Sequence, residues 1–122
     1  MKFYTLFFFL MAFYFDAYNQ SISGIVNSYA EVTGVSANSV NVVSTFGFSE
    51  GDKVLLIQMK GATITTGNIS DFGVITSLNN AGNFEFGIIE SIAGPTITLE
   101  SDLCESYEIS GHVQLVQVPV YT

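Results

Sequence analysis

Beyond residue 20, apolar and polar side chains alternate along the chain with a period of two, which is the pattern of half-buried β-strands. Val40 and Val42 fall on one face while Asn41 falls on the other, and residues 97–99 alternate in the same way. β-Branched residues dominate, and Gly, Asn and Ser interrupt the pattern at intervals of roughly ten residues. Because no helical period appears in this part of the sequence, the pattern predicts a compact all-β domain.

Short turns separate the expected strands. Ala37-Asn38 lies between two extended runs and suits a tight hairpin. Gly94-Pro95 takes the equivalent place later in the chain, where the fixed φ and missing N–H of proline do least harm. Gly51-Asp52 precedes an aliphatic strand expected over Lys53–Met59, and Ser110-Gly111 precedes a similar one. A phosphate-binding loop would be followed by a helix, whereas a strand is expected after Gly51. We therefore interpret Gly51 as part of a turn.

The two halves of the domain resemble each other. At an offset of 57 the matched pairs are Val32 with Ile89, Val35 with Ile92, Val40 with Ile97 and Val42 with Leu99. After a two-residue shift they are Val54 with Val113, Leu56 with Leu115, Ile57 with Val116 and Gln58 with Gln117. The match indicates internal duplication, although two ordinary amphipathic strands can also coincide by chance. Two such units would form a small barrel or a two-sheet sandwich about a pseudo-twofold axis, and closure would remove unpaired edges.

A long polar connection lies between the two halves. Lys60–Ser70 is rich in Gly, Thr and Ser, and we expect it to be a surface loop with little order of its own. Asp71–Leu78 is either one strand or one short helical turn, because its apolar pattern does not separate the two. Since loops carry binding residues more often than strands do, we expect any ligand contact here or near Asn79–Phe84.

The first residues predict export. Lys2 is followed by an unbroken run of thirteen apolar or aromatic residues and threonine, Phe3–Phe15, which ends at Asp16. A membrane-spanning helix needs roughly 20 such residues, so the run fits a signal-peptide helix better than a transmembrane one. We predict a signal peptide over residues 1–19 with cleavage before Gln20, and a β domain over residues 20–122. The expected location is secreted or at the cell surface, with no membrane span after cleavage.

Charge and cysteine content narrow the possible functions. The 122 residues hold 11 acidic side chains against 3 Lys and no Arg, for a formal charge of -8. Nucleic-acid binding needs a basic stripe, which three lysines cannot build. Cys104 is the only cysteine, so the domain must be stable without an internal disulfide. We expect Cys104 to be a partly buried small hydrophobe, because the only histidine, His112, lies in a strand-like context and not beside a nucleophile.

No arrangement of residues indicates catalysis. Acidic residues gather at Glu50 and Asp52, and again at Glu100, Asp102 and Glu105, but neither group matches a calcium-binding loop. We therefore expect solvated turn carboxylates. One Cys and one His cannot supply a zinc site, and no nucleophile elbow or cofactor fingerprint is present. The sequence predicts no enzyme, and we assign no catalytic, cofactor-binding or metal-binding residues.

Aromatic residues leave carbohydrate binding open, since flat rings favour contacts with sugars. The domain has no Trp, and its other aromatics include Tyr29, Phe46, Phe48, Phe72, Phe84, Phe86, Tyr107 and Tyr121. Most occupy alternating positions, so we expect most of them to pack in the core.

Three segments together resemble a known group of proteins. V-N-S-Y-A-E-V-T-G-V at Val26–Val35, G-F-S-E-G-D-K-V-L-L-I-Q-M-K-G-A-T-I at Gly47–Ile64 and N-A-G-N-F-E-F at Asn80–Phe86 are similar to the N-terminal region of large exported Bacteroidota surface proteins. Those proteins are linked to adhesion, gliding and type nine secretion. The similarity covers nearly all of Val26–Tyr121 and brings no catalytic residues.

In that family the chain usually continues past this region into a repetitive, glycine-rich β region and a sorting domain, so the resemblance implies that residues 20–122 correspond to a first module; the alternative is a small free exported protein. We therefore expect a non-catalytic structural or adhesive N-terminal module of an exported cell-surface protein, whose partner is a surface polymer or protein. The alternative is a small carbohydrate-binding module that uses loop aromatics.

Overall fold

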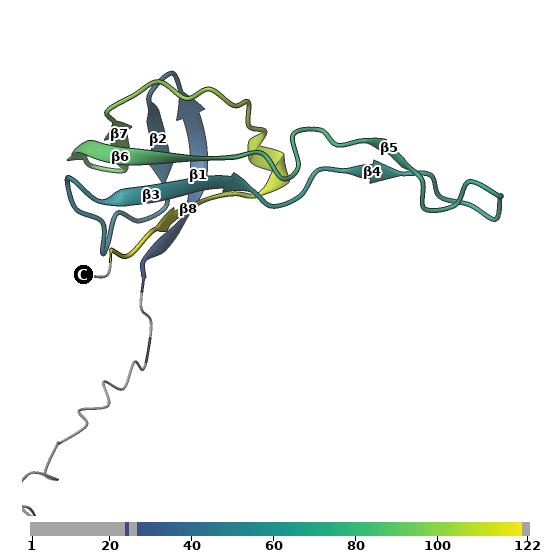
Figure 1. The fold of residues 1–122 in the computed structure, drawn as a ribbon, viewed down its shortest axis with the longest axis horizontal. Helices are drawn as coiled ribbons and strands as arrows, with labels where there is room; N and C mark the ends of the chain where they lie inside the picture. The colour runs from purple at the N-terminus through teal and green to yellow at the C-terminus, as the bar shows by residue number, and fades with distance from the viewer. Residues whose placement is uncertain (1–23, 25–26, 121–122) are drawn as a thin grey trace, which may run out of the picture.

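The structure, a computed structural model, describes residue 24 and residues 27–120. Six strands form a closed antiparallel barrel in the order β1-β2-β7-β6-β3-β8, and two short strands form a separate sheet (Figure 1). The barrel strands are β1 (Tyr29–Ser36), β2 (Ser39–Val42), β3 (Lys53–Gln58), β6 (Phe84–Ala93), β7 (Thr96–Leu99) and β8 (Val113–Gln117). The separate sheet contains β4 (Thr63–Ile64) and β5 (Ile75–Ser77), and a 3-10 helix, η1 (Ile109–Gly111), precedes β8. The predicted all-β fold is confirmed, in its barrel form.

The predicted turns are confirmed. Residues 37 and 38 join β1 to β2, and Gly94-Pro95 joins β6 to β7. Gly94 has a φ of 59°, a left-handed conformation that glycine adopts without the steric cost of a Cβ. The aliphatic run after Gly51-Asp52 forms β3, as expected, and it lies in the wall of the barrel between β6 and β8.

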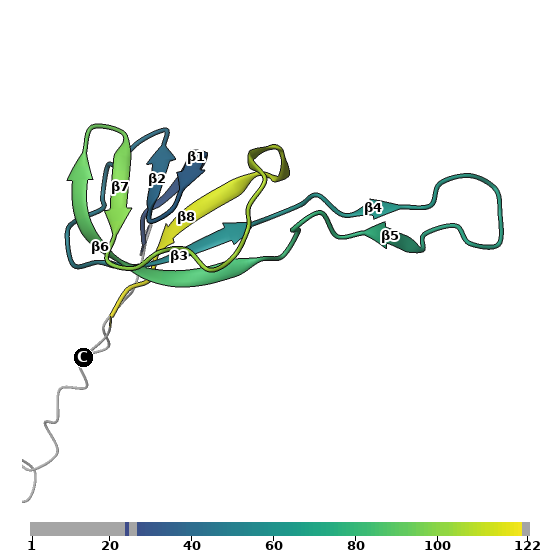
Figure 2. The same ribbon diagram turned by 90° about the horizontal axis from the view of Figure 1, so that it is seen from above.

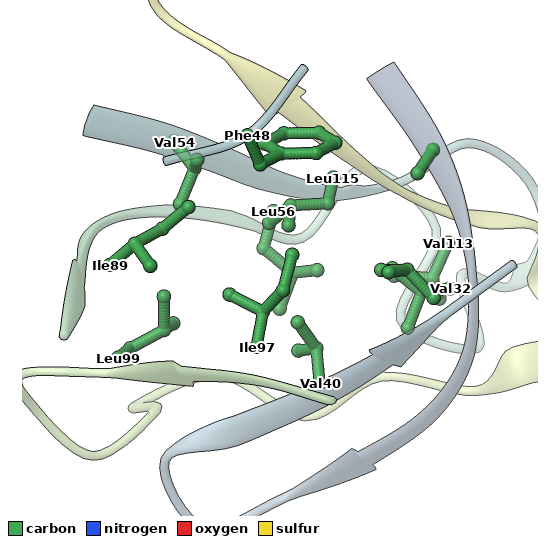
Figure 3. Close-up of a cluster of buried hydrophobic side chains, with 12 residues drawn as sticks. Val32, Val40, Phe48, Val54, Leu56, Ile89, Ile97, Leu99, Val113 and Leu115 are labelled. Carbon is green, nitrogen blue, oxygen red and sulfur yellow. The ribbon is translucent and has the colours of Figure 1, made fainter. Parts of the chain in front are cut away.

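The core lies inside the barrel and is built from the inward-facing residues of all six strands together with Phe48. Figure 3 shows its aliphatic side chains converging from opposite walls. Val54 and Val113, which the sequence match pairs with each other, are both fully buried. Each fully buried aliphatic side chain contributes about 1.5–3 kcal/mol, as an upper estimate. The core residues are Ala30, Val32, Val40, Val42, Phe48, Val54, Leu56, Ile89, Ile97, Leu99, Val113 and Leu115.

Two hairpins of the barrel have matching registers. In β1–β2, Val32 pairs with Val42 and Val35 with Val40, and the register shifts between Val32 and Gly34. In β6–β7, the corresponding pairs are Ile89 with Leu99 and Ile92 with Ile97, and the register shifts between Ile89 and Ser91. The remaining strands, β3 and β8, pair through Leu56 opposite Leu115, with Val54 opposite Gln117 and Gln58 opposite Val113.

The connection between the halves differs from expectation. Lys60–Ser70 is not an unordered loop, because Thr63 and Ile64 form β4 and pair with β5. Asp71–Leu78 was expected to be either a strand or a short helical turn, and it contains a strand, because residues 75–77 form β5. Consecutive β-branched residues on both sides of the tip, at 63–66 and 74–76, favour extended backbone here.

Two further expectations are wrong. Most of the aromatic side chains do not pack in the core: Phe48 is buried and Tyr107 packs against the core, but five are exposed, namely Tyr29, Phe46, Phe72, Phe84 and Phe86. Cys104 is exposed and not partly buried, because it lies in the connection between β7 and β8, outside the barrel wall.

The predicted signal peptide over residues 1–19 and its cleavage site before Gln20 lie outside the described residues, as does Tyr121. Within residue 24 and residues 27–120, no helix has both the length and the apolar character needed to cross a membrane.

Candidate interaction site: the β4–β5 arm

Residues 60–79, which we call the arm, leave one end of the barrel and extend away from it (Figures 1 and 2). β4 and β5 pair through Thr63 with Ser77 and Ile64 with Ile75. Beyond them the Thr65 amide donates to the Val74 carbonyl at 2.8 Å, and the Gly73 amide donates back to Thr65 at 2.9 Å. Among the described residues, the arm is therefore a hairpin that pairs only with itself.

The arm exposes an unusual amount of apolar surface. None of its residues is buried, and Phe72 is 66% exposed. The six large apolar side chains that face solvent are Ile64, Ile69, Phe72, Val74, Ile75 and Leu78. An isolated two-stranded hairpin is marginal in water, and ordering a residue costs about 1–2 kcal/mol of backbone entropy. Large exposed apolar patches mark interaction surfaces, so the arm is the leading candidate for a contact element.

A single buried side chain ties both strands of the arm to the barrel. Gln58 is fully buried at the end of β3, and its Nε2 donates to the carbonyl oxygens of Lys60 at 2.8 Å and Asn79 at 2.9 Å. The Glu108 backbone N–H donates to Gln58 Oε1 at 2.8 Å. Both amide hydrogens and the oxygen of Gln58 thus have partners. The side chain joins the first residue of the arm, its last residue and the connection that leads to β8.

Close backbone packing supports this junction. A Cβ on Gly111 would overlap Gln58 Nε2 and the Lys60 carbonyl oxygen. Gly61 has a φ of 141°, and a Cβ there would lie 2.9 Å from the Asn79 carbonyl oxygen. Asn79 Nδ2 in turn donates to the Gly61 carbonyl at 3.0 Å. The base of the arm is therefore rigid, although its outer part makes no contact with the core.

Aromatic side chains on β6 add apolar surface where the arm meets the barrel. Phe84 and Phe86 are each more than half exposed, and their rings meet edge to face with centroids 6.3 Å apart and an interplanar angle of 84°. Lys53 Nζ lies 4.8 Å from the centre of the Phe86 ring. A cation over the ring occupies the face that a sugar would otherwise use, and the perpendicular rings do not form a flat platform.

Glu85, which follows Phe84 in the chain but points to the opposite face of β6, has a structural role. Its carboxylate accepts hydrogen bonds from the backbone N–H groups of Cys104 at 2.9 Å and Glu105 at 3.2 Å, and from the Tyr107 hydroxyl at 3.0 Å. Burial, and then the bond to Glu85, raise the pKa of Tyr107 well above its ordinary value. The carboxylate fixes the connection between β7 and β8 to the barrel wall.

The other sequence candidates do not assemble into a chemical site. Asp52 accepts hydrogen bonds from the Ser49 backbone N–H and from Gln117 Nε2. Its carboxylate therefore stabilises the turn before β3. His112 has a φ of 53°, is exposed and follows η1 directly. Among the residues that the structure describes, no three His, Cys, Asp or Glu side chains gather as metal ligands would.

No protein family, curated protein or solved structure matches the chain. What the protein does has to follow from its own residues. The sequence pairs Gln58 with Gln117 but gives no sign that Gln58 anchors the arm. The available signal was a lone polar side chain at the end of an aliphatic run.

Proposed function

We propose that the protein is a non-catalytic structural or adhesive module of an exported cell-surface protein, and that the arm makes its principal contact. The observation that carries this proposal is the arm itself, which presents six large apolar side chains and buries none of its residues. A segment of this composition gains free energy mainly by covering those side chains against a partner.

The barrel supports the proposal by acting as a rigid base. Gln58 fixes both strands of the arm to the end of β3, so the arm leaves the barrel in a defined direction. A preorganised contact element loses less conformational entropy on binding than a flexible loop would.

Export is the second part of the proposal. It rests on the apolar run Phe3–Phe15 behind Lys2, on the acidic composition and on the resemblance to Bacteroidota surface proteins. Mass spectrometry of the protein recovered from the outside of producing cells tests it. We expect a mature chain that begins at Gln20, and a chain that keeps residues 1–19 and stays inside the cell would contradict export.

The two halves of the barrel are, in our proposal, copies of one ancestral unit. The matching registers of β1–β2 and β6–β7 support this, as do two equivalent bonds after the long strands: Met59 N–H to the His112 carbonyl, and Val118 N–H to the Lys53 carbonyl. The halves differ where β1 meets β8 and β6 meets β3, because those registers are offset by two residues from strict symmetry.

Carbohydrate binding is the second candidate, and the exposed aromatic side chains favour it. Phe46 is 90% exposed and Phe72 lies on the arm. A glycan array would separate the two proposals. Micromolar binding to a polysaccharide that is lost in Phe72→Ala or Phe46→Ala would favour a carbohydrate-binding module.

Shortening the arm tests the leading proposal. Replacing residues 63–77 by a short Gly-Ser turn keeps Gln58, Gly61 and Asn79, so we expect the barrel to melt within a few degrees of the wild type. Beads coated with the wild-type protein should be retained on producing cells, and beads coated with the shortened protein should wash off. Equal retention of both would contradict a role for the arm.

A further inference from the structure

The arm and the barrel differ sharply in charge. Residues 27–59 and 80–120 hold nine carboxylates against Lys53 alone, so the acidic charge of the domain lies on the barrel. The arm holds one positive and one negative side chain, Lys60 and Asp71, and is neutral. Two barrels would repel each other at close range, whereas two arms would not.

We propose that two copies of this chain associate through their arms, which pack side by side in antiparallel directions. The inference rests on the proposed function of the arm as a contact element and identifies its partner as a second copy. It concerns the surface formed by β4, β5 and the six exposed apolar side chains named above.

The positions of the two charges favour an antiparallel pair. Lys60 lies at the base of the arm, where its carbonyl accepts from Gln58, and Asp71 lies in the turn at the tip, between Thr65 and Gly73. In an antiparallel pair the tip of one arm reaches the base of the other, so each Lys60 meets the Asp71 of the other copy. A parallel pair would place like charges together, which is unfavourable.

The length of the arm keeps the two acidic barrels of such a pair far enough apart to weaken their repulsion. About ten extended residues separate its base from its tip, and at about 3.3 Å per residue they reach roughly 30 Å. The Debye length is only about 8 Å at physiological ionic strength. Two acidic barrels at opposite ends of an arm pair would therefore be screened from each other.

The surface offered suits a weak, reversible contact. Ile64 and Ile75 pair on one face of the hairpin and Val74 points to the other, so one partner arm covers only part of the six side chains and would bury several hundred Å² in total, the size of a weak interface. Among the strands that the structure describes, β4 and β5 pair only with each other, so each has one edge with no strand partner there. Charged residues and proline normally protect a strand edge from pairing with another chain. Residues 61–70 and 72–79 contain neither.

Charge reversal tests the antiparallel register. Sedimentation equilibrium of the purified exported protein should show a reversible dimer. Lys60→Asp and Asp71→Lys should each raise the dimer Kd by about tenfold or more, because each converts two attractive pairs into repulsive ones. The double variant Lys60→Asp/Asp71→Lys should restore the wild-type Kd. Glu90→Lys, on the exposed face of β6, is the matched control for Asp71→Lys and should leave the Kd unchanged.

Folding does not confuse these outcomes, because the arm contains no buried residue and circular dichroism can check each variant. A protein that stays monomeric at several hundred micromolar would overturn the inference, as would a dimer that survives the shortened arm or a double variant that is not restored. A monomer whose arm still retains beads on cells would overturn only the inference and leave the proposed function intact. An arm-dependent dimer without such retention would support the inference and count against adhesion.

Discussion

The side-chain amide of Gln58 donates a hydrogen bond of 2.9 Å to the backbone carbonyl of Asn79, the residue at which the arm returns to the barrel. The same nitrogen donates to Lys60, the residue at which the arm begins. A single side chain from the barrel wall therefore closes the loop that the arm makes. The Gln58 side chain is polar, fully buried and separate from the apolar surface that the arm offers to a partner.

Removing the donors of Gln58 should destabilise the protein. In Gln58→Leu the carbonyl oxygens of Lys60 and Asn79 and the N–H of Glu108 lose their buried partner, and we expect the free energy of unfolding to fall by about 2–4 kcal/mol. Urea denaturation followed by circular dichroism measures the change. Gln114→Leu, at a half-buried position of β8, is the control and should cost less than about 1 kcal/mol. Equal costs for the two variants would contradict the role of Gln58.

The strands and tight turns could be predicted from the sequence because their signals are local. Ala37-Asn38 and Gly94-Pro95 have the chemistry of turns, and alternation identifies which residues share a face. The order of strands around the barrel depends on pairings between distant segments, such as β2 with β7, and no local pattern encodes it. The sequence therefore left the barrel and the sandwich open.

The burial of the aromatics was mispredicted for a reason visible on β6. Alternation shows that Phe84 and Phe86 share a face, but not that the face is outward. The opposite face carries Glu85, which is partly buried, and Gly87, where a Cβ would lie 3.0 Å from Leu99. A small residue and a hydrogen-bonded carboxylate occupy inward positions here, so hydrophobicity points to the wrong side.

The arm was missed because its sequence signals conflict. Gly, Ser and Thr around Gly67 favour a loop, whereas Ile64 and Ile75 favour strands. A hairpin with no buried face has no amphipathic pattern, and every residue of β4 and β5 is exposed. The sequence of the arm therefore has the pattern of an ordinary polar loop that contains a few hydrophobic residues.

The junction glycines should be intolerant of alanine. Gly61→Ala would strain a φ of 141° and bring a Cβ to 2.9 Å from the Asn79 carbonyl oxygen. Gly67 also has a positive φ, of 124°, but no atom within 4 Å of the site of a Cβ. We expect Gly61→Ala to cost about 1–3 kcal/mol more than Gly67→Ala in thermal unfolding. The difference measures the close packing at the base, and no difference would mean that the base relaxes freely.

Charges placed inside the barrel should unfold it. Val54→Asp and Val113→Asp each put an unpaired carboxylate at a position with 0% exposure, for which we expect losses of at least 4 kcal/mol and no cooperative thermal transition. Val43→Asp is the control, because Val43 is 67% exposed and should tolerate the change. Wild-type melting of either core variant would refute the inward orientation of that strand.

Alkaline pH should weaken the protein through Tyr107. Burial and the hydrogen bond to Glu85 raise its pKa in the folded state above the unfolded value of about 10. Below about pH 10 both states keep the phenol proton and the contribution to stability is complete. Above it the unfolded chain loses the proton first, so the free energy of unfolding falls as the pH rises towards the folded pKa.

Tyr107→Phe isolates this effect from the other tyrosines. The variant loses the bond to Glu85, so it should be less stable than the wild type at pH 7. Because Phe does not titrate, the stability of the variant should fall less steeply above about pH 10. The free energies of unfolding of the two proteins, measured with urea, should therefore converge as the pH rises. Tyr29→Phe is the control, since Tyr29 is 62% exposed, and its stability should follow the wild-type pH profile. Parallel profiles for wild type and Tyr107→Phe would show that the proton of Tyr107 contributes nothing to alkaline unfolding.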